Sequence, residues 1–198
     1  GDFVKLNTGN FNNSIDNMTY DYQGNLWFVS SRQGILRLSK SAFTQLYNTY
    51  NTDSSVVNTV TWWNDGFYIG TDNGLYVSKD ENTNTKGRCI TPVIDALNGV
   101  RIRCIKEDSK GNLWICTSGA GVYKLTIDGG VKKYDKSNGL NGELYRTVTE
   151  LSDNTILVAG DSGMSFIKDD DSVYNIGTQM INSKVLCTLQ ADDKTIFA

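Results

Sequence analysis

An internal repeat constrains the fold of this chain more than any other feature of its sequence. The segment GNLWFVSS…GILRL at 24–38 returns as GNLWICTS…GVYKL at 111–125, and two weaker copies lie at 65–77 and 154–167. The second glycine of each copy recurs in steps of 40, 47 and 42 residues, at Gly34, Gly74, Gly121 and Gly163. Steps of this size are typical of β-propellers, in which each repeat forms one four-stranded blade.

Each repeat predicts four short antiparallel strands divided by turns. The second strand is the continuous apolar run LWFV, FYIG, LWIC or ILVA, and such a run indicates a sheet covered on both faces by its neighbours. A tight turn is expected before the second strand, starting at Asp21 or Asp108. Aspartate can bond its own backbone there, and the glycine that follows can take positive φ. The first, inner strand is expected at Ile15–Tyr20, Val56–Thr61, Val100–Lys106 and Tyr145–Leu151.

The fourth strand of each repeat is expected to be a polar outer edge. It is expected at Phe43–Tyr47 and Val131–Tyr134, and in the second repeat at Cys89–Val93. Pro92 fits there, because an edge strand tolerates a missing N–H. Phe3–Leu6 indicates an outer strand of a preceding blade.

The predicted fold class is therefore all-β, a propeller segment of about four and a half blades built from four-stranded antiparallel sheets. A fifth copy begins at Lys184–Cys187 and reaches Thr195–Ala198, where the sequence given stops. The expected boundaries are an outer strand at 1–12, blades at 13–53, 54–98, 99–140 and 141–180, half a blade at 181–198, and a polar insertion at 79–88.

The two strong copies resemble the two-component regulator propeller repeat, whose pattern is approximately D-x-x-G-x-L-W-I-G-T-x-x-G-L. The third repeat follows that pattern at Asp108, Gly111, Leu113, Trp114, Ile115, Thr117, Gly121 and Val122, and the first at Asp21, Gly24, Leu26, Trp27 and Gly34. The weaker copies carry Tyr68 and Leu157 where tryptophan is usual, and Cys116 and Val29–Ser30 depart at the I-G step.

This resemblance implies a bacterial sensor. In that family, propellers of about seven blades stand outside the membrane, ahead of a transmembrane helix joined to a histidine kinase, a hybrid kinase-regulator or a cyclic-di-nucleotide synthase. Many such sensors report on carbohydrate. The expected location is therefore extracytoplasmic, anchored through other parts of the parent protein.

Composition excludes several other functions. The formal net charge is -3, and the lysines and arginines are scattered, which argues against a nucleic-acid partner or an anionic membrane surface. No apolar run approaches the roughly 18 residues of a membrane span, and 1–5 lacks the pattern of a signal peptide. The chain has no histidine, which removes His-dependent triads and nearly every catalytic zinc site.

The remaining chemical features favour structural roles, and the sequence predicts no catalytic residue, no metal site and no cofactor. Trp27 and Trp114 are expected in the core between blades, with a sugar-stacking platform as the alternative. Asp169–Asp171 is expected to form a solvated turn rather than a cation site. The four cysteines show no CxxC pair; buried small side chains are expected, and a disulfide is the alternative. Carboxylates available for glycoside chemistry are Glu81, Glu107, Glu143 and Glu150.

A ligand is expected at one mouth of the propeller channel, on the loops that join outer to inner strands and second to third strands. Amide, carboxylate and aromatic groups there suit sugar hydroxyls. The predicted ligand-binding residues are Arg32, Gln33, Asp72, Asn73, Asn141, Tyr145 and Asp161, with Asn12, Asn13, Asn138 and Ser162 on the same loops.

The leading hypothesis is a non-catalytic sensor segment that binds a small molecule or oligosaccharide. A propeller lyase or glycosidase and a protein-interaction scaffold are the alternatives. Because the fifth repeat is incomplete, its unpaired strand edge also predicts association with another copy of the chain through the terminal blades.

Overall fold

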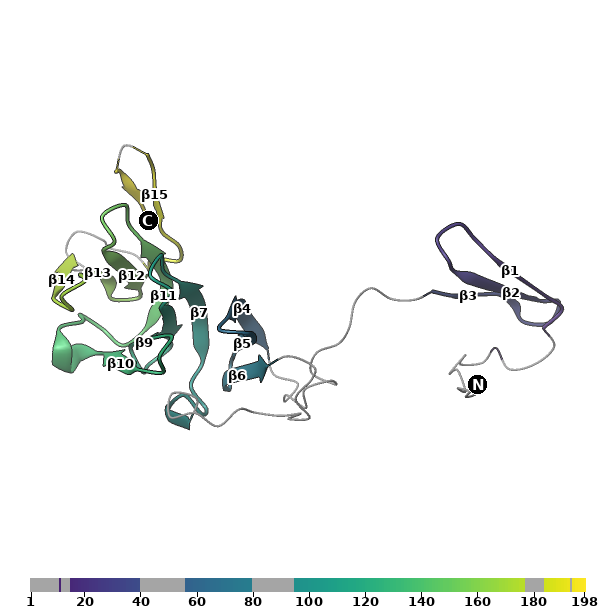
Figure 1. Ribbon diagram of the computed structural model, residues 1–198, viewed down its shortest axis with the longest axis horizontal. Helices are drawn as coiled ribbons and strands as arrows, with labels where there is room; N and C mark the ends of the chain where they lie inside the picture. Colours follow the sequence, from purple (N-terminus) through teal and green to yellow (C-terminus); the bar gives the residue numbers. More distant parts are fainter. Residues whose placement is uncertain (1–10, 12–14, 40–55, 80–94, 177–183, 193) are drawn as a thin grey trace. The chain divides into compact units, whose positions relative to one another are not determined.

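The structure, a computed structural model, describes residues 11, 15–39, 56–79, 95–176, 184–192 and 194–198 (Figure 1). The chain forms two compact units, residues 1–45 and 46–198. The outer strands expected at 3–6, 43–47 and 89–93 lie outside the described residues, as does the expected insertion apart from Lys79.

The regular structure of the described residues is almost entirely β. The first unit contains one antiparallel sheet, β1 (Asn17–Tyr20), β2 (Leu26–Ser30) and β3 (Gly34–Leu38). The second unit begins with a three-stranded sheet, β4 (Val57–Trp63), β5 (Gly66–Thr71) and β6 (Gly74–Lys79). Within each sheet, strands that follow one another in sequence pair with one another.

Two four-stranded sheets and a short hairpin complete the second unit. The third sheet holds β7 (Ile102–Glu107), β8 (Leu113–Thr117), β9 (Val122–Leu125) and β10 (Val131–Tyr134). The fourth holds β11 (Tyr145–Glu150), β12 (Ile156–Gly160), β13 (Gly163–Ile167) and β14 (Val173–Ile176), and β15 (Leu189–Gln190) pairs with β16 (Ile196–Phe197). A 3-10 helix, Lys136–Asn138, joins the two larger sheets.

This architecture confirms the predicted fold class, an all-β run of four-stranded propeller blades. The inner strands β4, β7 and β11 contact one another in that order, as the first strands of successive blades do (Figure 1). Side chains link them directly, since Asn58 Nδ2 donates to the Ile102 carbonyl (3.0 Å) and the Ile105 amide donates to Thr59 Oγ1 (3.3 Å). No helix in the described part of the chain has the length and apolar character needed to cross a membrane.

Apolar layers between successive sheets explain why the second strand of a repeat is apolar on both faces. Leu113 and Ile115 of β8 lie in a core shared with β4–β6. Trp114 and Cys116, the alternate residues of the same strand, lie in a second core shared with the fourth sheet. A third core joins the fourth sheet to the segment around Val185. The strands β7, β8 and β9 of the third sheet thus each contribute to two cores, as their period-2 side-chain alternation requires.

A single aspartate organises the turn that precedes the second strand. Asp108 accepts hydrogen bonds from the Trp114 indole N–H (2.7 Å), from the Asn112 side chain (2.9 Å) and from the backbone amides of Lys110 and Asn112. Burial raises the pKa of Asp108, but the bonds from Trp114 and Asn112 outweigh it, so the pKa lies below its usual value. The expected turn aspartate is therefore also the partner of the repeat's tryptophan.

The first repeat builds the same turn. Asp21 accepts from the Asn25 amide side chain (2.9 Å) and the Trp27 indole N–H (2.9 Å), and these bonds lower its pKa to about 2. Trp114 is 2 % exposed and stacks on Tyr134, which confirms its place in the core, whereas Trp27 is only partly buried within its own unit.

Truncating Trp114 tests its two roles. Trp114→Ala should lower the free energy of unfolding by about 3–5 kcal/mol, because it empties a large core site. Trp114→Phe keeps an aromatic ring but removes the indole N–H that donates to Asp108. This variant should lower the free energy of unfolding by about 1–3 kcal/mol. Chemical denaturation measures both, and an alanine variant that loses less than about 1 kcal/mol would contradict the packing role.

Acid should weaken the aspartate turns. Their folded pKa lies below the unfolded value of about 3.9, so their stabilisation is complete above about pH 4 and is lost as the pH falls through the folded pKa, about 2 for Asp21. The stability difference between wild type and Asp108→Asn should therefore shrink on acidification from about pH 5 to about pH 2. Urea denaturation at several pH values measures it, and a constant difference would exclude Asp108 as the titrating group.

Candidate functional site

Three inner strands carry a β-bulge at the same place. The pairing of inner and second strands shifts between Val57 and Thr59, between Ile102 and Cys104, and between Tyr145 and Thr147. The extra residues are Asn58, Arg103 and Arg146. A bulge re-aims the side chain of its extra residue and is common beside binding sites.

Each bulged side chain contacts the first residue after the second strand of its own sheet. Asn58 Nδ2 donates to Asp72 Oδ1 (2.7 Å). Arg103 Nε donates to Ser118 Oγ (2.7 Å). Arg146 Nε donates to Asp161 Oδ1 (2.5 Å). The same bulged backbone thus carries three different side-chain pairs, one in each of the three sheets.

The two kinds of loop expected to form the ligand site meet at this bulged end of the sheets. The Gly99 amide donates to the Asn73 carbonyl (2.9 Å), and the Gly121 amide donates to the Glu143 carbonyl (2.9 Å). The Val185 amide donates to the Gly160 carbonyl (3.2 Å). Each second-to-third-strand turn therefore packs against the connection that enters the next sheet.

Four cations lie along this end; we call them the basic row, Arg101, Arg103, Arg146 and Lys184. Arg101 Nε lies 2.6 Å from Asp72 Oδ1, an ion-pair contact without hydrogen-bond geometry. Asp161 binds Arg146, and Lys184 Nζ lies 3.4 Å from its other oxygen. In the described part of the chain, ion pairs thus join three cations of the row to two carboxylates.

The charges of the row influence one another. The bond from Asn58, followed by the charge of Arg101, holds the pKa of Asp72 below its usual value against its burial. Arg146 lowers the pKa of Asp161. Burial, then the charges of Arg101 and Arg146, lowers the pKa of Arg103, while the charges of Asp72 and Asp161 act in the opposite direction, so all of these groups lie within Coulombic reach of Arg103.

The structure brings Asp72, Asn73 and Asp161 of the predicted ligand residues to the bulged end of the second unit. Asn141 and Tyr145 are also there but bind each other: the Tyr145 hydroxyl lies 2.9 Å from Asn141 Oδ1 and 3.1 Å from Ser165 Oγ. The Tyr145 side chain is 0 % exposed. Its ring therefore belongs to the core between the third and fourth sheets.

Arg32 and Gln33 lie in the β2–β3 turn of the first unit, where Ser30 Oγ accepts from both of their amides. Asn12 and Asn13 lie outside the described residues. Sequence reasoning missed the three arginines of the basic row. For Arg103 and Arg146 the signal is a basic residue within an inner strand, at the position where the apolar alternation shifts by one residue, as in RIRCIKE and LYRTVTE.

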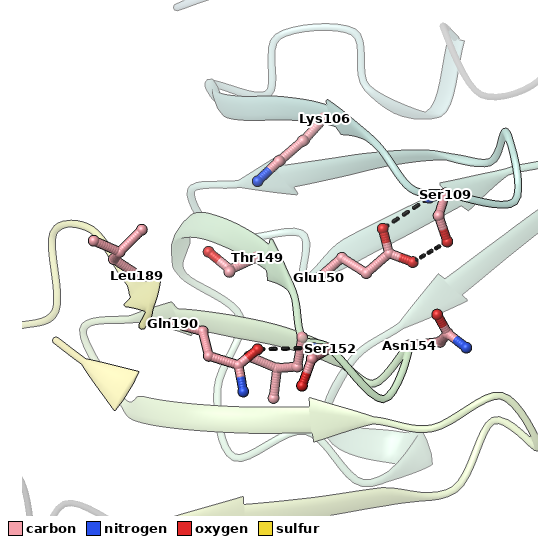
Figure 2. Close-up of a pocket in the computed structure, with 9 residues that line it drawn as sticks. Lys106, Ser109, Thr149, Glu150, Ser152, Asn154, Leu189 and Gln190 are labelled. Carbon is pink, nitrogen blue, oxygen red and sulfur yellow. Dashed lines mark hydrogen bonds between the residues drawn. The ribbon is translucent and has the colours of Figure 1, made fainter. Parts of the chain in front are cut away.

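A polar pocket of about 460 Å³ lies at the opposite end of the inner strands (Figure 2). It is lined by Lys106, Ser109, Thr149, Glu150, Leu151, Ser152, Asn154, Leu189 and Gln190. Figure 2 shows Glu150 directed at Ser109 of the neighbouring sheet, whose amide and hydroxyl bind its two carboxylate oxygens at 2.8 and 2.5 Å. Glu150 is thus held as an inter-sheet link, and Gln190 makes a similar link to the Ser152 amide (2.7 Å).

Acidic and thiol groups are dispersed in the described part of the chain, where no three His, Cys, Asp or Glu side chains gather as a metal site requires. Asp169 pairs with Lys110, Asp170 binds Ser172, and Asp171 binds Lys132. Cys116 is buried, Cys104 is half-buried and Cys187 is exposed, and these three are free thiols. The burial expected for cysteine therefore does not extend to Cys187.

A family comparison matches the third repeat. The family described as "Two component regulator propeller" matches residues 96–119, which include the Asp108 turn, β8 and the Arg103 bulge. The chain contains a two-component regulator propeller repeat. The resemblance stated from the sequence is confirmed, and the regulator propeller repeat accounts for the Asp108–Trp114 pair at the centre of its pattern.

Among solved structures, this chain shares its fold with virginiamycin B lyase from Staphylococcus aureus, at a TM-score of 0.54 and 13 % identity over 90 % of this chain. The extracellular domains of two hybrid two-component systems from B. thetaiotaomicron are also similar, with TM-scores of 0.45 and 0.39, identities of 15 and 18 %, and 94 and 98 % of this chain covered. The chain spans 60 % of the lyase and about a third of each receptor domain. No curated protein matches the chain.

Removing the Tyr145 hydroxyl tests whether that residue supports the fold or a ligand. Tyr145→Phe should lower the free energy of unfolding by about 1–2 kcal/mol, because Asn141 and Ser165 lose a buried partner. Thermal and chemical denaturation measure this loss. A variant of unchanged stability that had lost saccharide binding would instead assign Tyr145 to the ligand site.

Proposed function

We propose that this chain is a ligand-sensing segment of a bacterial signal-transduction receptor and that it binds carbohydrate without turning it over. The observation that carries the proposal is the bulged end of the second unit, where amide, carboxylate and guanidinium groups recur at one backbone position in successive sheets of a regulator propeller.

Such an end suits a saccharide chemically. Neighbouring sugar hydroxyls are recognised by pairs of hydrogen-bond donors and acceptors. Guanidinium groups supply the donors, and carboxylates supply the acceptors. Rigid strands hold these groups, since each bulged side chain is anchored by a turn residue at 2.5–2.7 Å. A pre-organised site of this kind loses little entropy when a ligand binds.

The proposal extends to the parent protein. We place the chain outside the cytoplasm, as the extracellular domains among its structural neighbours are, with ligand occupancy transmitted through the packing between sheets. Association of two copies through the terminal blades remains a prediction from the sequence.

A direct experiment separates sensing from catalysis. The purified chain is titrated calorimetrically with a panel of neutral and acidic oligosaccharides, and the same mixtures are assayed for new reducing ends and for the ultraviolet absorbance of lyase products. We expect binding without product. Steady product release that is abolished by Glu107→Gln, Glu143→Gln or Glu150→Gln would replace the sensor proposal with an enzyme.

Two matched variants locate the binding. Asp161→Asn removes a carboxylate acceptor at the bulged end and should weaken the binding of neutral oligosaccharides about tenfold, the loss typical of one charged hydrogen bond. Asn154→Ala alters the pocket of Figure 2 at the other end of the sheets and should leave affinity unchanged. The reverse pattern would move the ligand to that pocket.

A further inference from the structure

Arg103 differs from the other arginines of the basic row in its partners. Arg101 faces Asp72 and Arg146 binds Asp161, whereas Arg103 binds only the neutral hydroxyl of Ser118. Among the described residues, no carboxylate pairs with Arg103. Its Nε is engaged by Ser118, and within the described part of the chain neither terminal nitrogen of the guanidinium has a hydrogen-bond acceptor.

The surroundings make this lack of a partner unfavourable. Arg103 is partly buried, and the positive charges of Arg101 and Arg146 lie within Coulombic reach of it. Asp72 and Asp161 also lie within reach, and their opposing contributions are weaker. A guanidinium that is partly desolvated among like charges is stabilised when an anion approaches it. The two nearby carboxylates are already engaged, Asp72 by Asn58 and Arg101, and Asp161 by Arg146 and Lys184.

We propose that the basic row binds the anionic group of an acidic saccharide, a carboxylate or a sulfate, and that Arg103 contacts it through its terminal nitrogens. The saccharide part of this assignment rests on the proposed function, whereas the anion part rests on the row itself. A planar carboxylate matches the two parallel N–H groups of a guanidinium edge, and a sulfate oxygen pair does so equally well.

Binding is measured by calorimetry on the full 198-residue chain with tetragalacturonate, with the methyl ester of the same tetrasaccharide, and with inorganic sulfate. We expect tetragalacturonate to bind at least about tenfold more tightly than its uncharged ester, because a charged hydrogen-bonded pair is lost. We also expect the affinity to fall as the ionic strength rises from about 50 to about 500 mM, since salt screens the row.

Two variants isolate Arg103 without disturbing the fold. Arg103→Asn places there the side chain that the second sheet carries at its own bulge, Asn58. Ser118→Asp gives Arg103 the carboxylate partner that Arg146 has in Asp161. Both should weaken the binding of tetragalacturonate and sulfate about tenfold or more while the melting temperature stays near that of wild type.

The control is Lys110→Ala, which removes a cation at the opposite end of the third sheet and should leave anion binding unchanged. Equal binding of the acid and its ester, with Arg103→Asn also without effect, would overturn the anion site but leave the carbohydrate proposal intact. Binding of sulfate that depends on Arg103, without binding of any saccharide, would support the anion site and reject the carbohydrate proposal. Failure of wild type to bind either anion would overturn the inference.

Discussion

The hydrogen bond from the Trp114 indole to the Asp108 carboxylate is the interaction on which the rest of the third sheet, β7–β10, depends. It closes the turn between β7 and β8 and thereby sets the register of both strands. Because side chains alternate along a strand, fixing Trp114 toward the fourth sheet also directs Leu113 and Ile115 toward the second. A slip by one residue would exchange the two cores, so the turn determines how three sheets stack.

Close packing within the third sheet, and against the connection to the fourth, then determines the far ends of the same strands. A Cβ on Gly121 would collide with the Tyr134 carbonyl oxygen, so only glycine lets the second-to-third-strand turn sit against the end of β10. That turn also receives the connection entering β11, through the Glu143 carbonyl. The bulged end is therefore rigid backbone, and the side chains placed on it are held in position by the fold.

Repetition made the sheets predictable, because the second strands and the aspartate turns recur with little change and each local pattern agrees with the fold. The bulges were not predictable in the same way, since one extra residue moves Arg103 and Arg146 off the alternation from which faces are inferred. Tyr145 shows the other limit: a tyrosine beside polar loops favours a ligand contact, which stays a prediction, whereas the sequence alone does not show that its ring lies in a core or that its hydroxyl bonds Asn141. The strand expected from Lys184 instead pairs later, at Leu189–Gln190.

Comparing the three bulges shows which of their features the backbone imposes. The same geometry holds an amide with a carboxylate at Asn58 and Asp72, and a guanidinium with a carboxylate at Arg146 and Asp161. An aspartate therefore fits after the second strand in two sheets, and nothing in the repeat's geometry requires a serine at position 118 in the third. In the described residues, the sheet that matches the repeat pattern is also the one whose bulged arginine forms no ion pair. Since the scaffold accommodates an acidic partner in the other two sheets, the lack of an ion pair at Arg103 follows from its neighbour Ser118, and the anion that we propose takes the place that Asp161 holds beside Arg146.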